Sequence, residues 1–222
     1  GSIGHVGAWS FCEDKIMTTG GEGGMVTTND EVLWRAMWSF KDHGKSYAAV
    51  YEREHAPGFR WLHESFGTNW RMLEMQAVIG RIQLQRMAGW TATRTRYAEQ
   101  IWAACRSHSA LHVPEVPANV QHAHYKCYAY VRPEQLAAGW NRDRIVAAIN
   151  ALGVPCYQGS CSEVYMEKAF DGTGWRPAAP LPTAHALGTT SVMFLVHPTL
   201  TQAEVDTTCT AIAQVMQQAT AA

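Results

Sequence analysis

The sequence predicts an α/β fold in which part of a larger domain precedes a small α/β domain. Two short strand-like runs flank a glycine-rich loop near the N-terminus. A long run of helix-forming residues follows at 72–108. Strand-like and helix-like segments then alternate to the end of the chain, as they do where helices cover a small sheet. We expect the first part to span residues 1–100 and the small domain residues 101–222.

The composition is that of a globular protein. The chain has 222 residues, of which 47% are apolar, and its 18 basic and 19 acidic side chains leave a net charge of −1. Nine Trp, eight Tyr and six Phe predict extensive buried surface inside the protein or between subunits. The chain has no long basic run, which argues against a nucleic-acid partner. Its longest apolar stretches, such as 192–196, are too short to cross a bilayer.

The chain begins like the middle of a domain. It has no initiator Met, and neither a basic nor an apolar signal-peptide segment opens it. We therefore expect a sequence truncated at its N-terminus. Six cysteines are scattered without a CxxC pair, so we expect reduced thiols and a cytoplasmic protein rather than a disulfide framework.

Two strands and a polar loop are predicted first. The short apolar run 6–12 favours a buried strand, and residues 25–28 read as a second strand. Between them lies an irregular segment with four glycines. The order is therefore strand, loop, strand.

A helix and a long loop follow. Asn29 or Asp30 can cap a helix that ends at His43-Gly44. Residues 45–68 contain Gly, Pro and several aromatic residues without a period. We expect a long functional loop there, because structureless connections of this size are uncommon in compact domains.

The rest of the chain alternates between helices and strands. We expect Gly89 and the threonine-rich stretch 91–95 to bend or break the helix predicted at 72–108. The later predictions are a strand at 125–131, a helix capped by Asn141, a strand at 191–196 and a helix opened by the capping box Thr201-x-x-Glu204.

A lysine and a glycine cluster follow the first predicted strand. Lys15 stands five residues after Ser10 and five before Gly20. Taken separately, a lysine is most often solvated and a glycine cluster is most often a turn. Together they place an amine beside backbone that a ligand can approach closely, because glycine has no Cβ.

Residues 10–26, S-F-C-E-D-K-I-M-T-T-G-G-E-G-G-M-V, resemble the active-site lysine segment of the DegT/StrS sugar aminotransferases. Further blocks similar to this family lie, in the family's order, at 66–77, 124–128, 159–165 and 195–200. The resemblance covers essentially the whole chain but only the C-terminal portion of a family member. It implies the aspartate-aminotransferase fold (PLP fold type I) and the cofactor pyridoxal 5′-phosphate (PLP).

The resemblance also implies roles for individual residues. Lys15 would bind the PLP aldehyde covalently and then act as general acid and base, which needs an amine that can be neutral. Ser10 would donate its hydroxyl to the cofactor phosphate. Asn69 would reach the same phosphate from the neighbouring subunit, so that a homodimer would share its active sites. Without the resemblance, Ser10 reads as an ordinary strand residue and Asn69 as a helix cap.

Substrate contacts are implied around a second group of residues. The loop 44–68 and the turn at His43 would lie near the nucleotide-sugar site, with Arg71 and His197 as further candidates. Val196 stands where the family commonly has a proline before this histidine.

The implied activity is transfer of an amino group from L-glutamate to a keto-sugar linked to a nucleoside diphosphate, in lipopolysaccharide, O-antigen or antibiotic synthesis. Dehydratases of the family carry histidine in place of the lysine, so Lys15 argues against that variant. The acidic partner of the pyridine nitrogen and the ring-stacking residue come, in this family, from sequence upstream of Gly1. Glu13 and Asp14 cannot readily replace them, because they are neighbours of the lysine.

Two other functions stay open. The chain could be a non-catalytic fragment or remnant of this fold that only binds or dimerises. Alternatively, His122 and His124, or Cys156 and Cys161, could bind a metal, although no second pair with ligand spacing accompanies either one. We expect no metal site.

Overall fold

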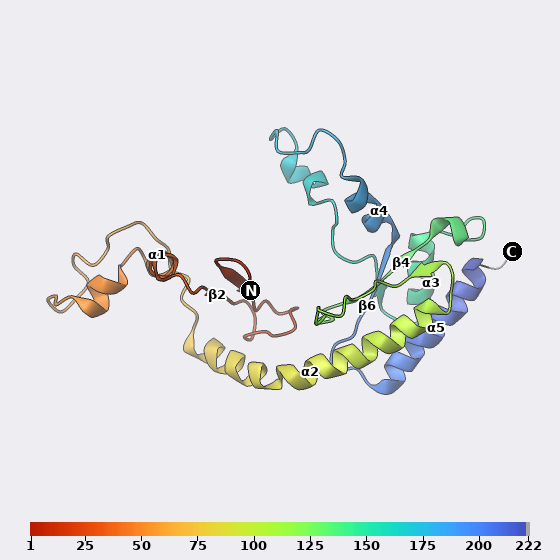
Figure 1. Cartoon of the computed structure of the whole chain (residues 1–222), viewed down its shortest axis with the longest axis horizontal. Coiled ribbons are helices and arrows are strands. Elements are labelled where there is room, and N and C mark those ends of the chain that lie inside the picture. Colours follow the sequence, from red (N-terminus) through yellow and green to blue (C-terminus); the bar gives the residue numbers. More distant parts are fainter. Residues whose placement is uncertain (221–222) are drawn as a thin grey trace. The chain divides into compact units, whose positions relative to one another are not determined.

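The computed structural model describes residues 1–220. The chain forms two compact units, one of residues 1–87 and one that begins at residue 88. Figure 1 follows the chain through its helices and strands. Among the described residues, no helix is both long and apolar enough to span a membrane.

The first unit contains a two-stranded antiparallel ribbon. Strand β1 (Gly7–Ser10) pairs with β2 (Gly24–Thr27), and Ser10 lies opposite Gly24. Both strands were predicted, but the prediction that the first is buried is wrong, because only Gly7 of β1 is buried. Within residues 1–220 the two strands pair only with each other, so Trp9 and Met25 keep about half of their surface exposed.

Helix α1 (Glu31–Lys41) follows as predicted. Its N-cap is Asp30, whose side chain accepts a hydrogen bond from the backbone N of Leu33 at 3.0 Å. None of its residues is buried. The chain then makes a short π-helical turn, η1 (Ala48–Glu52), inside the segment that the sequence predicted to be a loop.

Helix α2 (Glu74–Arg106) runs without interruption through 33 residues. The sequence predicted a bend or a break near Gly89, and the break does not occur. A single glycine costs a helix only about 1 kcal/mol, and side chains after it, including Tyr97, Ile101 and Trp102, are buried in the core of the second unit. Tertiary packing outweighs the weak local signal.

The second unit is built on a four-stranded antiparallel sheet in the order β3-β4-β6-β5. Of its two inner strands, β6 (Ser191–Phe194) is buried throughout. The strands are β3 (Leu111–His112), β4 (Cys127–Val131), β5 (Cys156–Tyr157) and β6 (Ser191–Phe194). The predicted strands at 125–131 and 191–196 are confirmed as β4 and β6, whereas the two-residue strands were not predicted.

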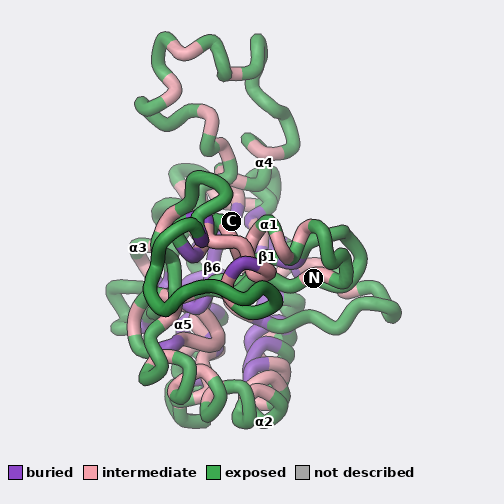
Figure 2. The backbone as a smooth tube through the Cα atoms, turned by 90° about the vertical axis from the view of Figure 1, so that its left-hand side faces the viewer, coloured by how far each residue is buried: buried purple, intermediate pink, exposed green. Residues whose placement is uncertain are grey.

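Helices pack beside this sheet in the second unit. They are α3 (Arg142–Ala151), α4 (Pro182–Thr190), α5 (Gln202–Thr220) and the C-terminal part of α2, with 3-10 turns η2 (Pro133–Gln135), η3 (Val164–Met166) and η4 (Lys168–Phe170). Asn141 caps α3 and the Thr201–Glu204 box opens α5, both as predicted. The buried residues, purple in Figure 2, include stretches of α2 and β6. The connected apolar core lies wholly in this unit.

Candidate functional site

The loop between β1 and β2 carries Lys15. It folds back on itself, because the backbone N of Phe11 donates to Gly23 O at 2.8 Å and that of Thr19 donates to Phe11 O at 3.3 Å. A tight turn then forms where Lys15 N donates to Cys12 O at 3.1 Å. The lysine therefore stands on a turn directly after β1.

The glycine cluster gives this loop its shape. Gly20 and Gly21 have φ values of +82° and +135°, which L side chains rarely adopt. A Cβ on Gly23 would lie 2.2 Å from Oγ1 of the buried Thr19. Gln76 at the start of α2 donates from Nε2 to Glu22 O at 2.7 Å. The loop is thus closely packed and tied to α2.

Lys15 and Ser10 have the chemistry that the resemblance requires of them. Lys15 Nζ lies 2.9 Å from Asp14 Oδ1, and 38% of its side chain is exposed. Ser10 Oγ accepts a long hydrogen bond, 3.4 Å, from the backbone N of Cys12. An accepting hydroxyl keeps its hydrogen, so Ser10 can still donate to a phosphate oxygen.

Two of the three acidic side chains near Lys15 have partners within the loop. Asp14 pairs with Lys15 itself, and Glu22 Oε1 accepts from Cys12 Sγ at 3.3 Å. Within the described residues of this loop, no acidic side chain stands apart from the lysine segment to face a pyridine nitrogen. The loop therefore offers an amine and a hydroxyl that fit the aldehyde and phosphate ends of PLP.

The structure brings His43, Asn69 and Arg71 together at a second place in the first unit. His43 has a φ of +63°, and its backbone N donates to Thr68 O at 2.9 Å. Arg71 Nε donates to Asn69 Oδ1 at 3.1 Å. Asn69 is therefore held by Arg71 rather than acting as a cap of α2, which begins at Glu74.

Sequence reasoning missed Asp42 in this group. The residue is buried, forms an isolated β-bridge with Asn69, and brings Oδ1 within 3.4 Å of Arg71 Nη1. Its position before His43-Gly44 at the end of a predicted helix was the available signal, but a carboxylate there looks like an ordinary surface residue.

His197 belongs to the second unit, in the turn between β6 and α5. Its Nδ1 lies 2.7 Å from Thr199 Oγ1. Partial burial, and then the positive charge of Arg94, lower the pKa of His197 below its ordinary value. The ring is therefore neutral at neutral pH and can act as a hydrogen-bond donor and acceptor.

A polar network missed by the sequence reasoning lies in the family-like block 159–165. Tyr165 donates its hydroxyl to Glu163 Oε1 at 2.7 Å, and His185 Nδ1 on α4 lies 2.9 Å from Glu163 Oε2. These two hydrogen bonds lower the pKa of Glu163. They join the segment before η3 to α4.

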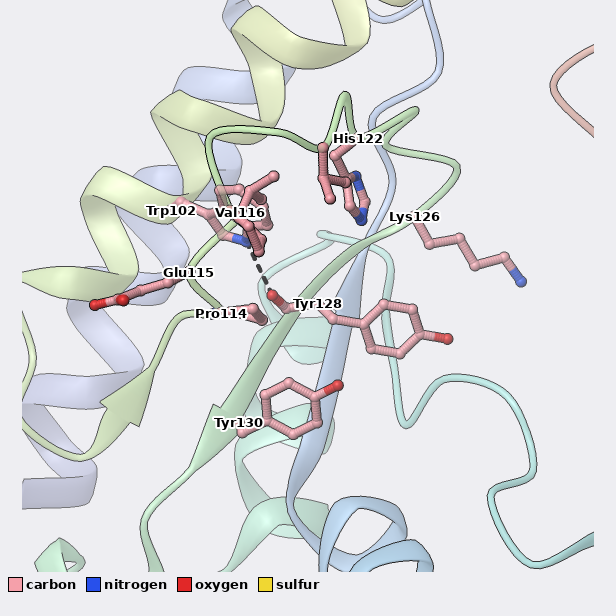
Figure 3. A pocket seen from close by; sticks show the side chains of 10 residues that line it. Trp102, Pro114, Glu115, Val116, His122, Lys126, Tyr128 and Tyr130 are labelled. Carbon is pink, nitrogen blue, oxygen red and sulfur yellow. Dashed lines mark hydrogen bonds between the residues drawn. The ribbon is translucent and has the colours of Figure 1, made fainter. Parts of the chain in front are cut away.

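A pocket of about 270 Å³ lies beside β4 in the second unit (Figure 3). Trp102 Nε1 donates to Tyr128 O across one wall at 2.9 Å. Figure 3 shows the side chains of Lys126 and Tyr128 pointing away from Trp102. None of the predicted PLP- or substrate-binding residues lines the pocket, although His122, a candidate metal ligand in the sequence, does. Among residues 1–220, no group of three or more His, Cys, Asp or Glu side chains is placed to hold a metal ion.

Residues 1–213 match the DegT/DnrJ/EryC1/StrS aminotransferase family, and the chain belongs to this family. The cofactor of the family is pyridoxal phosphate, and the fold is PLP fold type I. The resemblance inferred from the sequence motifs is thereby confirmed.

Three relatives give the scale of the similarity. The chain is 64% identical to an aminotransferase from Psychrobacter cryohalolentis, with a TM-score of 0.93, over 98% of this chain and 57% of that one. It is 30% identical to GDP-perosamine synthase of Caulobacter vibrioides, over 97% of this chain and 54% of that protein. It is 32% identical to a UDP-N-acetyl-3-dehydro-α-D-glucosamine 3-aminotransferase of Acidithiobacillus ferrooxidans, over 69% and 36%. The chain spans about half, or less, of the length of these curated relatives.

Proposed function

We propose that the protein is a PLP-dependent aminotransferase that transfers an amino group from L-glutamate to a nucleotide-linked keto-sugar. We further propose that it works in the cytoplasm as a homodimer with shared active sites, in the synthesis of amino sugars for a cell-surface polysaccharide or an antibiotic. Its relatives from Caulobacter vibrioides and Acidithiobacillus ferrooxidans are named for reactions on GDP- and UDP-linked sugars.

The observation that supports this proposal most directly is the Lys15 loop. A lysine amine stands on a tight turn directly after β1, with the Ser10 hydroxyl at the end of that strand. The positive φ values of Gly20 and Gly21 shape the backbone next to it. An amine, a hydroxyl donor and a glycine-rich loop are the parts needed to hold a phosphorylated aldehyde.

PLP, when bound, supplies an aldehyde that accepts the amino group and a ring that withdraws electrons from the reacting carbon. Lys15 would hold the aldehyde covalently at rest. Once the amino donor takes its place, the lysine amine would move a proton to or from the reacting carbon of the donor or the sugar. Ser10 and Asn69 would hold the phosphate, and His43, Arg71 and His197 are the proposed substrate-binding residues.

Labelling of Lys15 tests the proposal. We expect that borohydride reduction of the full-length gene product with PLP attaches a pyridoxyl group to Lys15, because reduction traps the covalent link between amine and aldehyde. Peptide mass spectrometry locates the label. Lys15→Ala should lose both the label and transamination, whereas Lys41→Arg in α1 should keep both.

Other outcomes of the same experiment would contradict the proposal. A label that stays on another lysine, or transamination that survives Lys15→Ala, would contradict the assignment. A protein that is labelled at Lys15 but transfers no amino group from any donor to GDP-, UDP- or dTDP-linked keto-sugars would instead be the non-catalytic form of the fold. Comparing L-glutamate with L-glutamine as donor in the same assay tests the proposed donor.

A further inference from the structure

The C-terminal end of α1 is closed by the segment that contains Asn69. The last carbonyls of a helix have no partners within it. Here Phe40 O accepts from Thr68 N at 2.7 Å, and Lys41 O accepts from Trp70 N at 3.0 Å. Two helix-end carbonyls thereby fix the backbone on both sides of Asn69.

Two glycines bring these segments into close contact. Gly44 has a φ of +84°, and a Cβ on it would lie 1.8 Å from Ser65 O. A Cβ on Gly67 would lie 2.4 Å from Gly44 N. Real Cβ atoms do not approach backbone this closely. The backbone just before Asn69 is therefore held in close contact with the segment that ends α1.

Asp42 directly follows α1, and its carboxylate is buried beside these contacts. Only 8% of the residue is exposed. Its Oδ1 lies 3.4 Å from Arg71 Nη1 and 3.7 Å from Lys45 Nζ, and within the described residues it accepts no hydrogen bond. A buried carboxylate is costly unless cations compensate it. Asp42 therefore draws the guanidinium of Arg71 inward.

Arg71 in turn sets the direction of the Asn69 amide. Its Nε donates to Asn69 Oδ1 at 3.1 Å, and its backbone N donates to the same oxygen at 3.4 Å. A guanidinium can only donate, so the amide must turn its oxygen toward Arg71. The NH₂ group of Asn69 then faces away from Arg71, and Asn69 is exposed. Both of its hydrogens can be donated to an anion.

We propose that Asp42 is a positioning residue: through Arg71, it orients the Asn69 amide as a donor to the cofactor phosphate. The inference rests on the proposed function, in which Asn69 binds the cofactor phosphate. The new element is the Asp42 carboxylate, which holds the Asn69 amide in its donating orientation before the phosphate binds. Such preorganisation strengthens binding because less freedom is lost when the ligand binds.

The test compares PLP with pyridoxal, which has the same aldehyde and ring but no phosphate. Asp42→Asn in the full-length protein should weaken PLP binding about tenfold, as expected for one misplaced charge-assisted hydrogen bond, and should leave pyridoxal binding unchanged. Kd values come from absorbance titration of the cofactor-free protein. A merely structural defect would weaken both ligands.

Further variants test the proposed route. Asn69→Ala should reduce the preference for PLP over pyridoxal, and adding Asp42→Asn to it should reduce the preference no further, because both act on one contact. Arg71→Gln, at an exposed residue, should resemble Asp42→Asn and serves if the Asp42 variant does not fold. Glu52→Gln is the matched control: Glu52 pairs with Arg35 elsewhere in the unit, and its loss should not change the preference.

The outcomes separate the two levels of the proposal. If Asn69→Ala lowers the preference for PLP but Asp42→Asn and Arg71→Gln do not, the role of Asp42 is wrong and the phosphate assignment stands. If Asn69→Ala also leaves the preference unchanged, the phosphate assignment and the role of Asp42 are both overturned. Loss of the borohydride label at Lys15 in the unmodified protein would separately contradict the proposed function.

Discussion

His124 lies buried in the second unit with a φ of +47°, and its ring contacts two other rings. The ring centroids are 4.3 Å from His122 and 5.1 Å from Trp102. Its carbonyl accepts from Arg94 Nη1 at 3.3 Å, and within residues 1–220 its Nδ1 has no hydrogen-bond partner. Burial, and then the proximity of His122, lower the pKa of His124. The folded protein therefore favours the neutral ring.

This pKa shift predicts how stability depends on pH. The unfolded chain, with a histidine pKa of about 6.5, binds the proton more readily than the folded state. The contribution of His124 to stability is therefore present above that pH and is lost as the pH falls toward the lowered pKa of the folded state.

Urea unfolding of the full-length protein from about pH 7.5 to about pH 5 measures this effect. His124→Asn should flatten the loss of stability toward acid pH, and Asn tolerates a positive φ better than most residues. The exposed His55→Asn should leave the pH profile as it is. Equal profiles for the two variants would mean that His124 does not contribute.

The sequence indicated some candidate site residues better than others. Lys15, Ser10 and Asn69 stood in motifs, so their positions could be named before the fold was known. Asp42 could not, because its role depends on burial against Arg71, a contact between residues 29 positions apart. The contact of the His124 ring with Trp102 likewise depends on a fold that its neighbours in sequence do not reveal.

At the scale of elements, the sequence predicted correctly those features that depend on residues close together in the chain. Asp30, Asn141 and the Thr201–Glu204 box mark helix starts correctly, because a cap needs only residues within one turn. Strands β3 and β5, of two residues each, show no alternation and exist through pairing with β4 and β6. Helix α2 passes Gly89 because later residues of the helix are buried in the core.

The contact between Gly44 and Ser65 gives a prediction at this scale. Gly44→Ala should destabilise the first unit by about 2 kcal/mol or more, because the new Cβ would meet Ser65 O at a φ of +84°. The matched control is Gly89→Ala, where a Cβ would have no neighbour within 4 Å. That change should stabilise α2 by up to about 1 kcal/mol. Chemical denaturation measures both, and destabilisation of similar size in both would contradict the steric argument.

At the scale of the whole molecule, the two units differ in how they bury apolar surface. The connected core is confined to the second unit. In the first unit, α1 has no buried residue, and Phe66 and Trp70 are largely exposed. Exposed apolar surface of this extent is typical of an interface. Several of the aromatic side chains that the composition predicted to be buried are thus exposed within their own unit.

This difference predicts how the two units behave alone. A fragment of residues 88–222 should unfold cooperatively and remain monomeric, because its core is complete. A fragment of residues 1–87 should bind a hydrophobic dye and self-associate. Calorimetry, dye fluorescence and size-exclusion chromatography check both fragments. A non-cooperative transition in the longer fragment would show that its core needs the first unit.

The two ends of the loop after α1 are joined to each other by backbone hydrogen bonds. Lys45 forms a β-bridge with His63, Ser46 N donates to Leu62 O at 3.2 Å, and Glu64 N donates to Gly44 O at 2.9 Å. Lengthening a loop whose ends are already joined costs little, since closure entropy grows only slowly with length. Residues 54–58, which are all exposed, can therefore be lengthened at little cost in stability. Changes in length there leave the paired ends of the loop and the backbone around Asn69 as they are.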